Sequence, residues 1–189
     1  MATSKTIGAG EIHAAIERLA AAIAERHEGK APILLLGIAN GGVELAQRLA
    51  KRLPSRNGIA GTVDISFHRD DIGRHPIPKE FAPTHIPADV QGATIILIDD
   101  VLYSGRTVKA ALDELFDHGR PAKVELAVLV DRGGRLLPVA ADYTGLTLAP
   151  ALGEKVVVHL DTKNPKLDSI HLEPAPKKSA ARNPQSAIL

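Results

Sequence analysis

Two adjacent carboxylates, followed by a short turn rich in hydroxyl groups and glycine, are the residues whose spacing most clearly suggests chemistry. Asp99 and Asp100 follow the apolar residues 94–98, and the turn Ser104-Gly105-Arg106-Thr107 precedes an amphipathic helix. A helix N-terminus offers free N–H groups and a positive dipole end to a phosphate, and hydroxyl groups and glycine assist. The aspartates would repel a phosphate, but they suit ribose hydroxyls or a hydrated Mg²⁺. The pattern therefore predicts a site for a phosphorylated sugar.

The alternative for this segment is structural, because an Asp-Asp pair at a strand end is, taken alone, most often a solvated turn. The apolar run before the pair and the Ser-Gly-x-Thr pattern after it favour a binding site instead. Apolar residues then repeat at helical spacing from Val108 to Phe116, and Gly119 and Pro121 end the helix. The chain contains neither GxxxxGK[ST] nor GxGxxG, which disfavours nucleotide triphosphatases and dinucleotide-binding enzymes.

The elements that must position these residues alternate between helix and strand. Apolar periodicity predicts helices at residues 11–26 and 43–52, central strands at 33–38, 62–67, 94–98 and 124–130, and edge strands at 156–160 and 169–172. The continuous apolar character of the central strands favours a parallel sheet that is covered on both faces. Open sheets of this kind bind ligands beyond the carboxyl ends of their strands, where the motifs of this chain fall.

A second candidate loop, Ala39-Asn40-Gly41-Gly42, ends the strand at 33–38 and opens the next helix. Its two glycines would expose backbone N–H groups beside a helix N-terminus, which suits a pyrophosphate. A strand–glycine–helix turn is about as often only a structural joint. Between residues 70 and 89 a polar, proline-dotted segment interrupts the regular pattern, and such a long loop in a compact domain is usually functional or mobile.

Composition narrows the class of protein. The 189 residues suffice for one domain with a core, and 44% hydrophobic and 24% charged residues are ordinary for a soluble globular protein. The absence of cysteine excludes disulfides and thiolate metal sites and favours a reducing, cytoplasmic location. No apolar run is long enough to span a bilayer, so we expect no membrane partner. A net charge of +1 gives no general attraction for nucleic acid.

The segment DDVLYSGRT, after its apolar strand, resembles the 5-phosphoribosyl-1-pyrophosphate (PRPP) signature of type I phosphoribosyltransferases. More narrowly, the chain resembles the PyrR family, whose members are pyrimidine operon regulators and also uracil phosphoribosyltransferases. The resemblance covers about residues 8–172 and includes GIANGGVELAQRL at 37–49, HRDDI at 68–72 and GRPAKVELAVLVDRGGRLLPVAADYTG at 119–145. The specific assignment rests on LVDRG followed by LPVAADYTG.

The resemblance implies an α/β fold of the type I phosphoribosyltransferase kind, with a mostly parallel central sheet flanked by helices and a small hood. The domain would span residues 1–173, and the composition of residues 174–189 predicts a disordered tail. The implied activity makes UMP and pyrophosphate from PRPP and uracil. Mg²⁺ is the implied cofactor, and a homo-oligomer, either a dimer or a larger assembly, is the implied state.

The resemblance also assigns site residues. PRPP would contact a continuous segment, Asp99, Asp100, Val101, Leu102, Tyr103, Ser104, Gly105, Arg106 and Thr107. Asp99 and Asp100 would be catalytic and would hold the metal through water or ribose hydroxyls. Arg69, in the Arg69-Asp70-Asp71 run that opens the hood, would be catalytic as well. The pyrophosphate would contact Ala39, Asn40, Gly41 and Arg69. Uracil would contact Val130, Asp131 and Arg132.

Two features qualify these assignments. Many family members carry Thr-Arg where this chain has Asn40-Gly41, so backbone donors must here do what an arginine side chain does elsewhere. Taken without the resemblance, Arg69-Asp70-Asp71 is more often a solvated corner, and Asp131-Arg132 a surface ion pair of little energetic weight.

Other functions stay open. One is a regulator that senses UMP or PRPP, binds RNA and has little or no enzyme activity. Family members with that role carry DRGHR and a Gly-Lys-Asn-Ile run after ADY, whereas this chain has DRGGR at 131–135 and Gly-Leu-Thr-Leu at 145–148. RNA binding would then need a local basic patch, such as Lys51, Arg52, Arg56 and Arg135. Another base, orotate or a purine, would share the PRPP signature but not the LVDRG and ADYTG segments.

Overall fold

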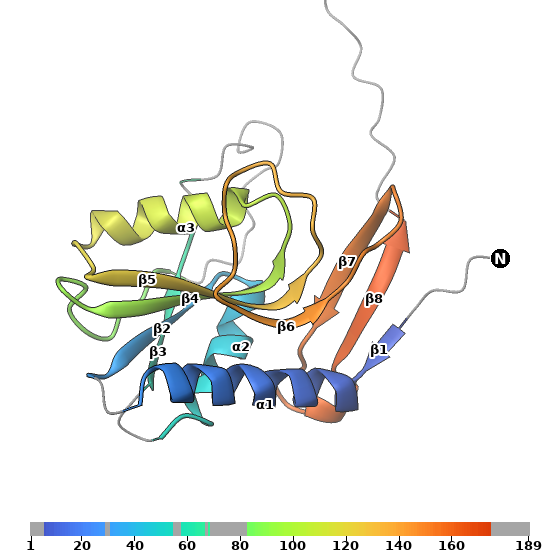
Figure 1. The fold of residues 1–189 in the computed structure, drawn as a ribbon, viewed down its shortest axis with the longest axis horizontal. Coiled ribbons are helices and arrows are strands. Elements are labelled where there is room, and N and C mark those ends of the chain that lie inside the picture. The colour runs from blue at the N-terminus through green and yellow to red at the C-terminus, as the bar shows by residue number, and fades with distance from the viewer. Residues whose placement is uncertain (1–5, 29–30, 55–57, 67, 69–82, 175–189) are drawn as a thin grey trace, which may run out of the picture.

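The computed structural model describes residues 6–28, 31–54, 58–66, 68 and 83–174 (Figure 1). Its elements are, in chain order, β1 (Thr6–Gly8), α1 (Ala9–Arg26), β2 (Ile33–Ile38), α2 (Gly41–Ala50), β3 (Gly58–Val63), β4 (Thr94–Leu102), α3 (Arg106–Asp117), β5 (Lys123–Asp131), β6 (Tyr143–Thr147), β7 (Glu154–His159), the 3₁₀ helix η1 (Pro165–Leu167) and β8 (Ser169–Pro174).

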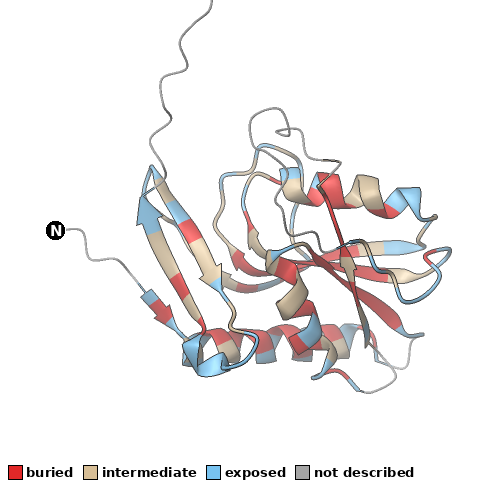
Figure 2. Cartoon of the chain, turned by 180° about the vertical axis from the view of Figure 1, so that it is seen from behind, coloured by how far each residue is buried: buried red, intermediate tan, exposed pale blue. Residues whose placement is uncertain are grey.

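Five strands form a parallel sheet in the order β3-β2-β4-β5-β6. All six residues of β2 are buried, which explains why this strand reads as an unbroken apolar run. Helices α1 and α2 pack on one face of the sheet and α3 packs on the other, so that the core has two layers (Figure 1). Buried residues accordingly concentrate in the central strands and on the inward sides of the helices (Figure 2). This architecture confirms the expected α/β fold with a parallel sheet.

A smaller antiparallel sheet, β1-β8-β7, stands beside the main one (Figure 1). Thr6 pairs with His171, so the two ends of the described chain meet in this sheet. A buried ion pair between Arg48 of α2 and Asp168, directly before β8, attaches the small sheet to the main body. Asp168 also accepts hydrogen bonds from the backbone of Asp161 at 2.8 Å and from His13 at 2.9 Å. Asp168 therefore joins the small sheet to both α1 and α2.

The sequence predicted most elements close to their observed bounds, with one clear error. The strand expected at 62–67 lies instead at Gly58–Val63, where its register against Ile33–Ile38 begins with Gly58. Gly58 and Gly61 interrupt the apolar alternation by which a strand is recognised in a sequence. Position 61 requires glycine because a Cβ there would lie 2.6 Å from the carbonyl oxygen of His85. The strands β1 and β6 were not expected. The strands predicted at 156–160 and 169–172 belong to the small sheet, where β7 lies at an edge as expected but β8 lies at the centre, between β1 and β7.

Some predictions fall on residues that the structure does not describe. Arg69, Asp70 and Asp71 and the hood that they were expected to open lie outside the described residues, as does Arg56. The same holds for the predicted tail at 174–189 apart from Pro174, which ends β8. Within the described ranges, none of the helices has the length and apolar character needed to cross a membrane.

Candidate active site

A cavity of about 640 Å³ opens at the carboxyl ends of β2 and β4. It is lined by residues from both predicted loops and from two further elements: Ala39, Asn40, Gly41, Ile65, Asp99, Asp100, Val101, Ser104, Arg106, Thr107 and Lys155. The two loops are about 60 residues apart in the sequence, and the parallel pairing of β2 with β4 brings them to one edge of the sheet. The topology therefore assembles the candidate phosphate and pyrophosphate loops around a single space.

The paired carboxylates are part of β4 itself. Pairing of β4 with β5 continues as far as Leu102, so the backbone at Asp99 and Asp100 is fixed by the sheet. Asp99 is buried, and its Oδ1 accepts a hydrogen bond from the backbone N–H of Asp100 at 3.0 Å. Burial and then the negative charge of Asp100 raise the pKa of Asp99 well above its ordinary value. Burial also raises the pKa of Asp100, against the opposing charge of Lys155. A cation or a hydroxyl donor that enters the cavity would lower both pKa values again.

The candidate phosphate loop is completed by the start of α3. Gly105 precedes this helix with a φ of 91°, a left-handed conformation that favours glycine. Its position is also tight, because a Cβ would lie 3.2 Å from Leu137 and 3.3 Å from Val139. The Ser104 hydroxyl oxygen accepts a hydrogen bond from the Arg106 N–H at 3.3 Å. Gly105 has no side chain that could cap the helix. The first turn of α3 lines the cavity through Arg106 and Thr107, and this helix start suits an anion.

The candidate pyrophosphate loop lies directly against the acidic end of β4. A Cβ at Gly41 would lie only 2.5–2.6 Å from the two carboxylate oxygens of Asp100, and one at Gly42 would overlap the carbonyl group of Ile98. The peptide bond between Ala39 and Asn40 is cis. This packing accounts for glycine at position 41, because Asp100 occupies the space that a side chain would need.

A second cavity, of about 280 Å³, shares Asp100, Val101 and Lys155 with the first. Its other lining residues come from the loop after β4, the loop after β5 and the small sheet: Tyr103, Arg132, Val156, Val157 and Val158. The Arg132 guanidinium lies 3.9 Å from the centre of the Tyr103 ring, which is a cation–π contact. Arg132 also donates a hydrogen bond to the carbonyl oxygen of Glu154 at 3.3 Å. The second cavity is thus a small, partly apolar slot that continues from the large one.

The turn after β5 is hydrogen-bonded to the backbone of the loop that carries Tyr103. Arg135 donates hydrogen bonds to the carbonyl oxygens of Leu102, Tyr103 and Val139 at 2.9–3.2 Å, and it pairs with Asp131 at 2.6 Å. Asp131 also accepts from the backbone N–H of Gly133 at 2.8 Å. Burial opposes the charge of Asp131, but the bonds from Gly133 and Arg135 outweigh it and lower the pKa of this carboxyl. Asp131 and Arg135 therefore organise the wall of the slot.

The predicted site residues divide between the two cavities and the core. The large cavity is lined by nine of them: Ala39, Asn40, Gly41, Asp99, Asp100, Val101, Ser104, Arg106 and Thr107. Tyr103 and Arg132 line the slot. Leu102 and Val130 are instead buried in the two core layers, and Asp131 faces its own turn. For Leu102, Val130 and Asp131, ligand contact therefore stays a prediction that concerns only their backbone groups.

Two residues of the large cavity were missed by sequence reasoning, as were the three valines of β7 that line the slot. Ile65 follows β3, whose bounds were predicted wrongly, and Lys155 lies in β7 of the small sheet. Lys155 is the more consequential, because it lines both cavities beside Asp100. A single lysine in an alternating strand carries no local sign of function, and only the docking of the small sheet brings it to the site.

Comparison with known proteins places this geometry in a family. A family model described as phosphoribosyl transferase domain matches residues 8–163. The bifunctional protein PyrR of Streptomyces coelicolor is 49% identical over 154 residues, which cover 79% of each chain. The bifunctional protein PyrR of Roseiflexus is 42% identical over 176 residues, which cover 91% of this chain and 96% of that one. The chain belongs to the PyrR family of phosphoribosyltransferases.

Solved structures agree at the level of the fold. A hypoxanthine-guanine phosphoribosyltransferase from Bacillus anthracis superposes with a TM-score of 0.65 at 20% identity, over 87% of this chain and 94% of that one. The hypoxanthine phosphoribosyltransferase of Trypanosoma cruzi gives 0.66 at 20% identity, over 88% and 94%. The expected family and the type I phosphoribosyltransferase fold are confirmed.

Proposed function

We propose that the chain transfers the phosphoribosyl group of PRPP to uracil and releases UMP and pyrophosphate. The observation that carries this proposal is the meeting of the two cavities at Asp100, Val101 and Lys155. The larger space has the anion-binding loops and carboxylates that a phosphorylated ribose needs, and the smaller slot beside it has room for a small flat ring. Membership of the PyrR family supports the same assignment.

In this proposal each part of the large cavity has its own role. The start of α3, with Ser104 and Thr107, binds the 5-phosphate through N–H and hydroxyl donors. Asp99 and Asp100 accept hydrogen bonds from the ribose hydroxyls. The loop Ala39-Asn40-Gly41 binds the pyrophosphate through its backbone. These groups fix the ribose so that its C1 atom faces the slot.

Mg²⁺ fits the donors of this site. Asp100 lines the cavity with its carboxylate beside Asp99. Burial raises the pKa of both carboxyl groups, and the charge of Asp100 raises that of Asp99 further, so a cation between them would stabilise their ionised forms. Either carboxylate would hold a hydrated Mg²⁺ through water, as this ion prefers. When bound with PRPP, Mg²⁺ supplies neutralisation of the charge that gathers on the departing pyrophosphate.

The chain's own contribution is positioning and electrostatic stabilisation. In the reaction the bond from C1 to the pyrophosphate oxygen breaks, the bond from C1 to N1 of uracil forms, and the N1 proton is released. Positive charge on the ribose in the transition state is stabilised by Asp99 and Asp100, and Lys155 attracts the leaving pyrophosphate. In the slot, uracil would lie near Tyr103 and Arg132, where polar groups along its edge would discriminate between bases.

The test of this site is Asp100→Asn, with Asp113→Asn as the matched control. Asp113 lies on α3 and pairs with Lys109 outside the cavity. Pyrophosphate release from PRPP and uracil should fall at least about 100-fold in the Asp100 variant, as expected for loss of a charged transition-state contact. The control should match the wild type. Unchanged kcat/KM in Asp100→Asn would remove the carboxylate pair from the mechanism.

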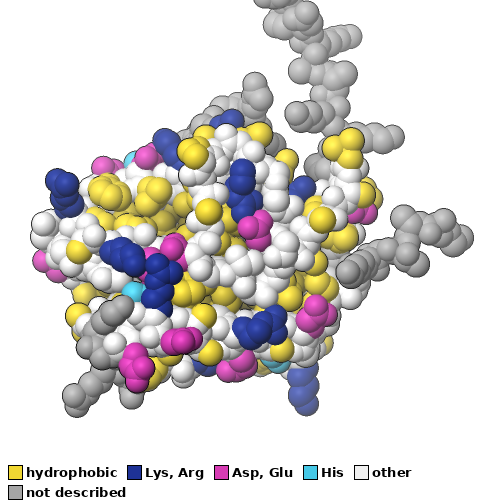
Figure 3. Space-filling view, viewed as in Figure 1, with side chains coloured by type: hydrophobic (Ala, Val, Ile, Leu, Met, Phe, Trp, Pro, Cys, Tyr) yellow, Lys and Arg dark blue, Asp and Glu magenta, His cyan; other side chains and the backbone are white. Residues whose placement is uncertain are grey.

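RNA binding is the second candidate function, since the relatives are named bifunctional, and the described residues favour it less. Gly134 replaces the histidine of the DRGHR motif and has a φ of 77°, and a Cβ there would lie 2.6 Å from the Tyr103 ring. Arg135 uses its donors on Asp131 and on backbone carbonyl oxygens of its own turn and of the neighbouring loop after β4, and Arg52 pairs with Glu17 at 2.6 Å. On the face in Figure 3, side chains of both charges are intermixed. A salt-dependent mobility shift of pyrimidine leader RNA that UMP strengthens would establish this function.

Assembly and location belong to the same proposal. We expect a homo-oligomer, and exposed apolar side chains such as Phe116, Leu136 and Leu152 offer surface for one. Sedimentation velocity would determine the number of chains. The cytoplasmic location expected from the sequence stays a prediction, which fractionation of cells would test.

A further inference from the structure

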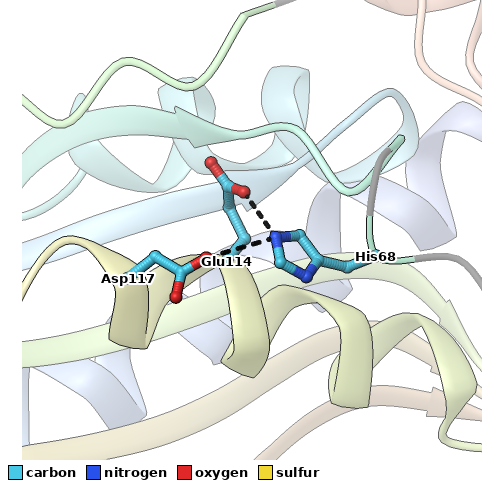
Figure 4. A group of neighbouring side chains, drawn as sticks. All are labelled: His68, Glu114 and Asp117. Atoms are coloured by element: carbon cyan, nitrogen blue, oxygen red, sulfur yellow. Dashed lines mark ion pairs between the residues drawn. The ribbon is translucent and has the colours of Figure 1, made fainter.

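Outside the two cavities, one histidine and two carboxylates converge at the C-terminal half of α3 (Figure 4). His68 comes from the segment after β3, and Glu114 and Asp117 lie one turn apart on the helix. Their ligand atoms all lie within 4.8 Å of one another. None of the three lines the cavities assigned to PRPP and uracil, so the active site does not account for this cluster.

The geometry of the cluster centres on one ring nitrogen. His68 Nε2 lies 3.0 Å from Glu114 Oε2 and 3.5 Å from Asp117 Oδ2 (Figure 4). A single N–H can donate one good hydrogen bond, so it cannot satisfy two carboxylates equally. A metal ion with four tetrahedral ligands at about 2.0–2.1 Å separates neighbouring ligand atoms by roughly 3.3 Å. The two observed separations bracket that value.

The surroundings of Glu114 resemble those of a metal ligand. Its other oxygen, Oε1, accepts hydrogen bonds from the Thr84 hydroxyl at 2.6 Å and from His118 Nε2 at 3.2 Å. These bonds fix the carboxylate so that Oε2 faces His68, which is how a second shell orients a ligand. The nearby cation Lys109 is paired with Asp113, one turn before Asp117. Among the described residues, Glu114 contacts His68 through one oxygen and His118 through the other, and Asp117 contacts His68.

We propose that His68, Glu114 and Asp117 bind a zinc-like transition-metal dication with three protein ligands and an open position for water. The imidazole nitrogen selects such an ion over Mg²⁺, which prefers oxygen ligands. The ion would join the segment after β3 to α3, three residues beyond Ile65 in the wall of the large cavity. Thr84, through its bond to Glu114, attaches a third segment at the same point.

The experiment is calorimetric titration of the metal-stripped, full-length chain with ZnCl₂ alone, without PRPP or uracil. The variants are His68→Ala and Asp117→Asn, and the matched controls are His159→Ala, an exposed histidine on β7, and Asp113→Asn. Circular dichroism and a melting curve without metal establish that each variant folds. A second titration of the wild type with Co²⁺, followed by visible absorption, reports whether a nitrogen ligand and tetrahedral geometry are present.

We expect one Zn²⁺ per chain in the wild type and both controls, and at least tenfold weaker binding in His68→Ala and Asp117→Asn. Zn²⁺ should raise the melting temperature of the wild type and not that of the folded His68 variant. Absence of binding in the wild type, or equal binding by the folded His68 and Asp117 variants, would overturn the proposal. Because no substrate is present, either result is independent of the transferase activity.

Discussion

Replacing Gly41 with alanine perturbs the site at the point where its two loops touch. The added Cβ would lie 2.5 Å from a carboxylate oxygen of Asp100, whereas ordinary contact begins at 3.4 Å, so the carboxylate must retreat by about 0.9 Å. A displacement of about 1 Å in a group that positions substrate costs roughly 100-fold in rate. That factor corresponds to about 2.7 kcal/mol in the activation barrier. Because the added Cβ would clash with a side chain at the cavity and not with the core, the free energy of unfolding should change little.

The assay is UMP formation at saturating and at low PRPP, alongside urea unfolding. Gly8→Ala is the control, because nothing lies within 4 Å of a Cβ at Gly8. Gly42→Ala is the contrast: its Cβ would overlap backbone of Ile98, and overpacking of this kind costs about 1–3 kcal/mol of folding stability. A Gly41 variant as active as the wild type would refute the contact between the pyrophosphate loop and Asp100.

Two further predictions concern a charge in the site and a charge in the core. Lys155→Gln should weaken PRPP binding roughly 10- to 100-fold, measured as KM, because a hydrogen bond to a charged group contributes about 1.5–3 kcal/mol; an unchanged KM would remove Lys155 from the site. Burial disfavours the charge of Glu125, but Lys123, His27 and Tyr143 lower its pKa from 4.5 to about 2. A lowered pKa in the folded state stabilises the protein above pH 4.5, and this contribution disappears as the pH falls toward 2. In urea unfolding at pH 7, Glu125→Gln should therefore have a free energy of unfolding lower by on the order of 3 kcal/mol. Below pH 4.5 the stability of this variant should fall less steeply than that of the wild type. Parallel plots of stability against pH for the two proteins would contradict this.

The sequence was most informative where the signal is local. The apolar run before Asp99, the turn at Ser104 and the helix after it are consecutive in the chain, so their types and order predicted this strand–turn–helix arrangement, which the structure shows. Val130 shows the limit of this logic: it precedes a polar turn, but the pleat of β5 turns its side chain into the core. The side chain of Leu102, at the end of β4, lies in the other core layer for the same reason.

Features that depend on distant contacts could not be predicted. Lys155 reaches the site only because the Arg48–Asp168 pair and the strand pairing of β7 dock the small sheet beside β4. The stacking of Arg132 on Tyr103 joins residues from two loops, each of which looks like an ordinary turn on its own. The metal-ligand cluster joins His68 to residues 46 and 49 positions later, a spacing that matches no local motif.

Whether this site joins phosphoribose to uracil is best measured as product formation from PRPP with a panel of bases. Uracil, orotate, hypoxanthine and adenine would each be incubated with PRPP and Mg²⁺, and the nucleotides separated by chromatography. We expect UMP from uracil and no nucleotide from the other three bases. Turnover of a different base, or PRPP binding without turnover of any base, would contradict this expectation.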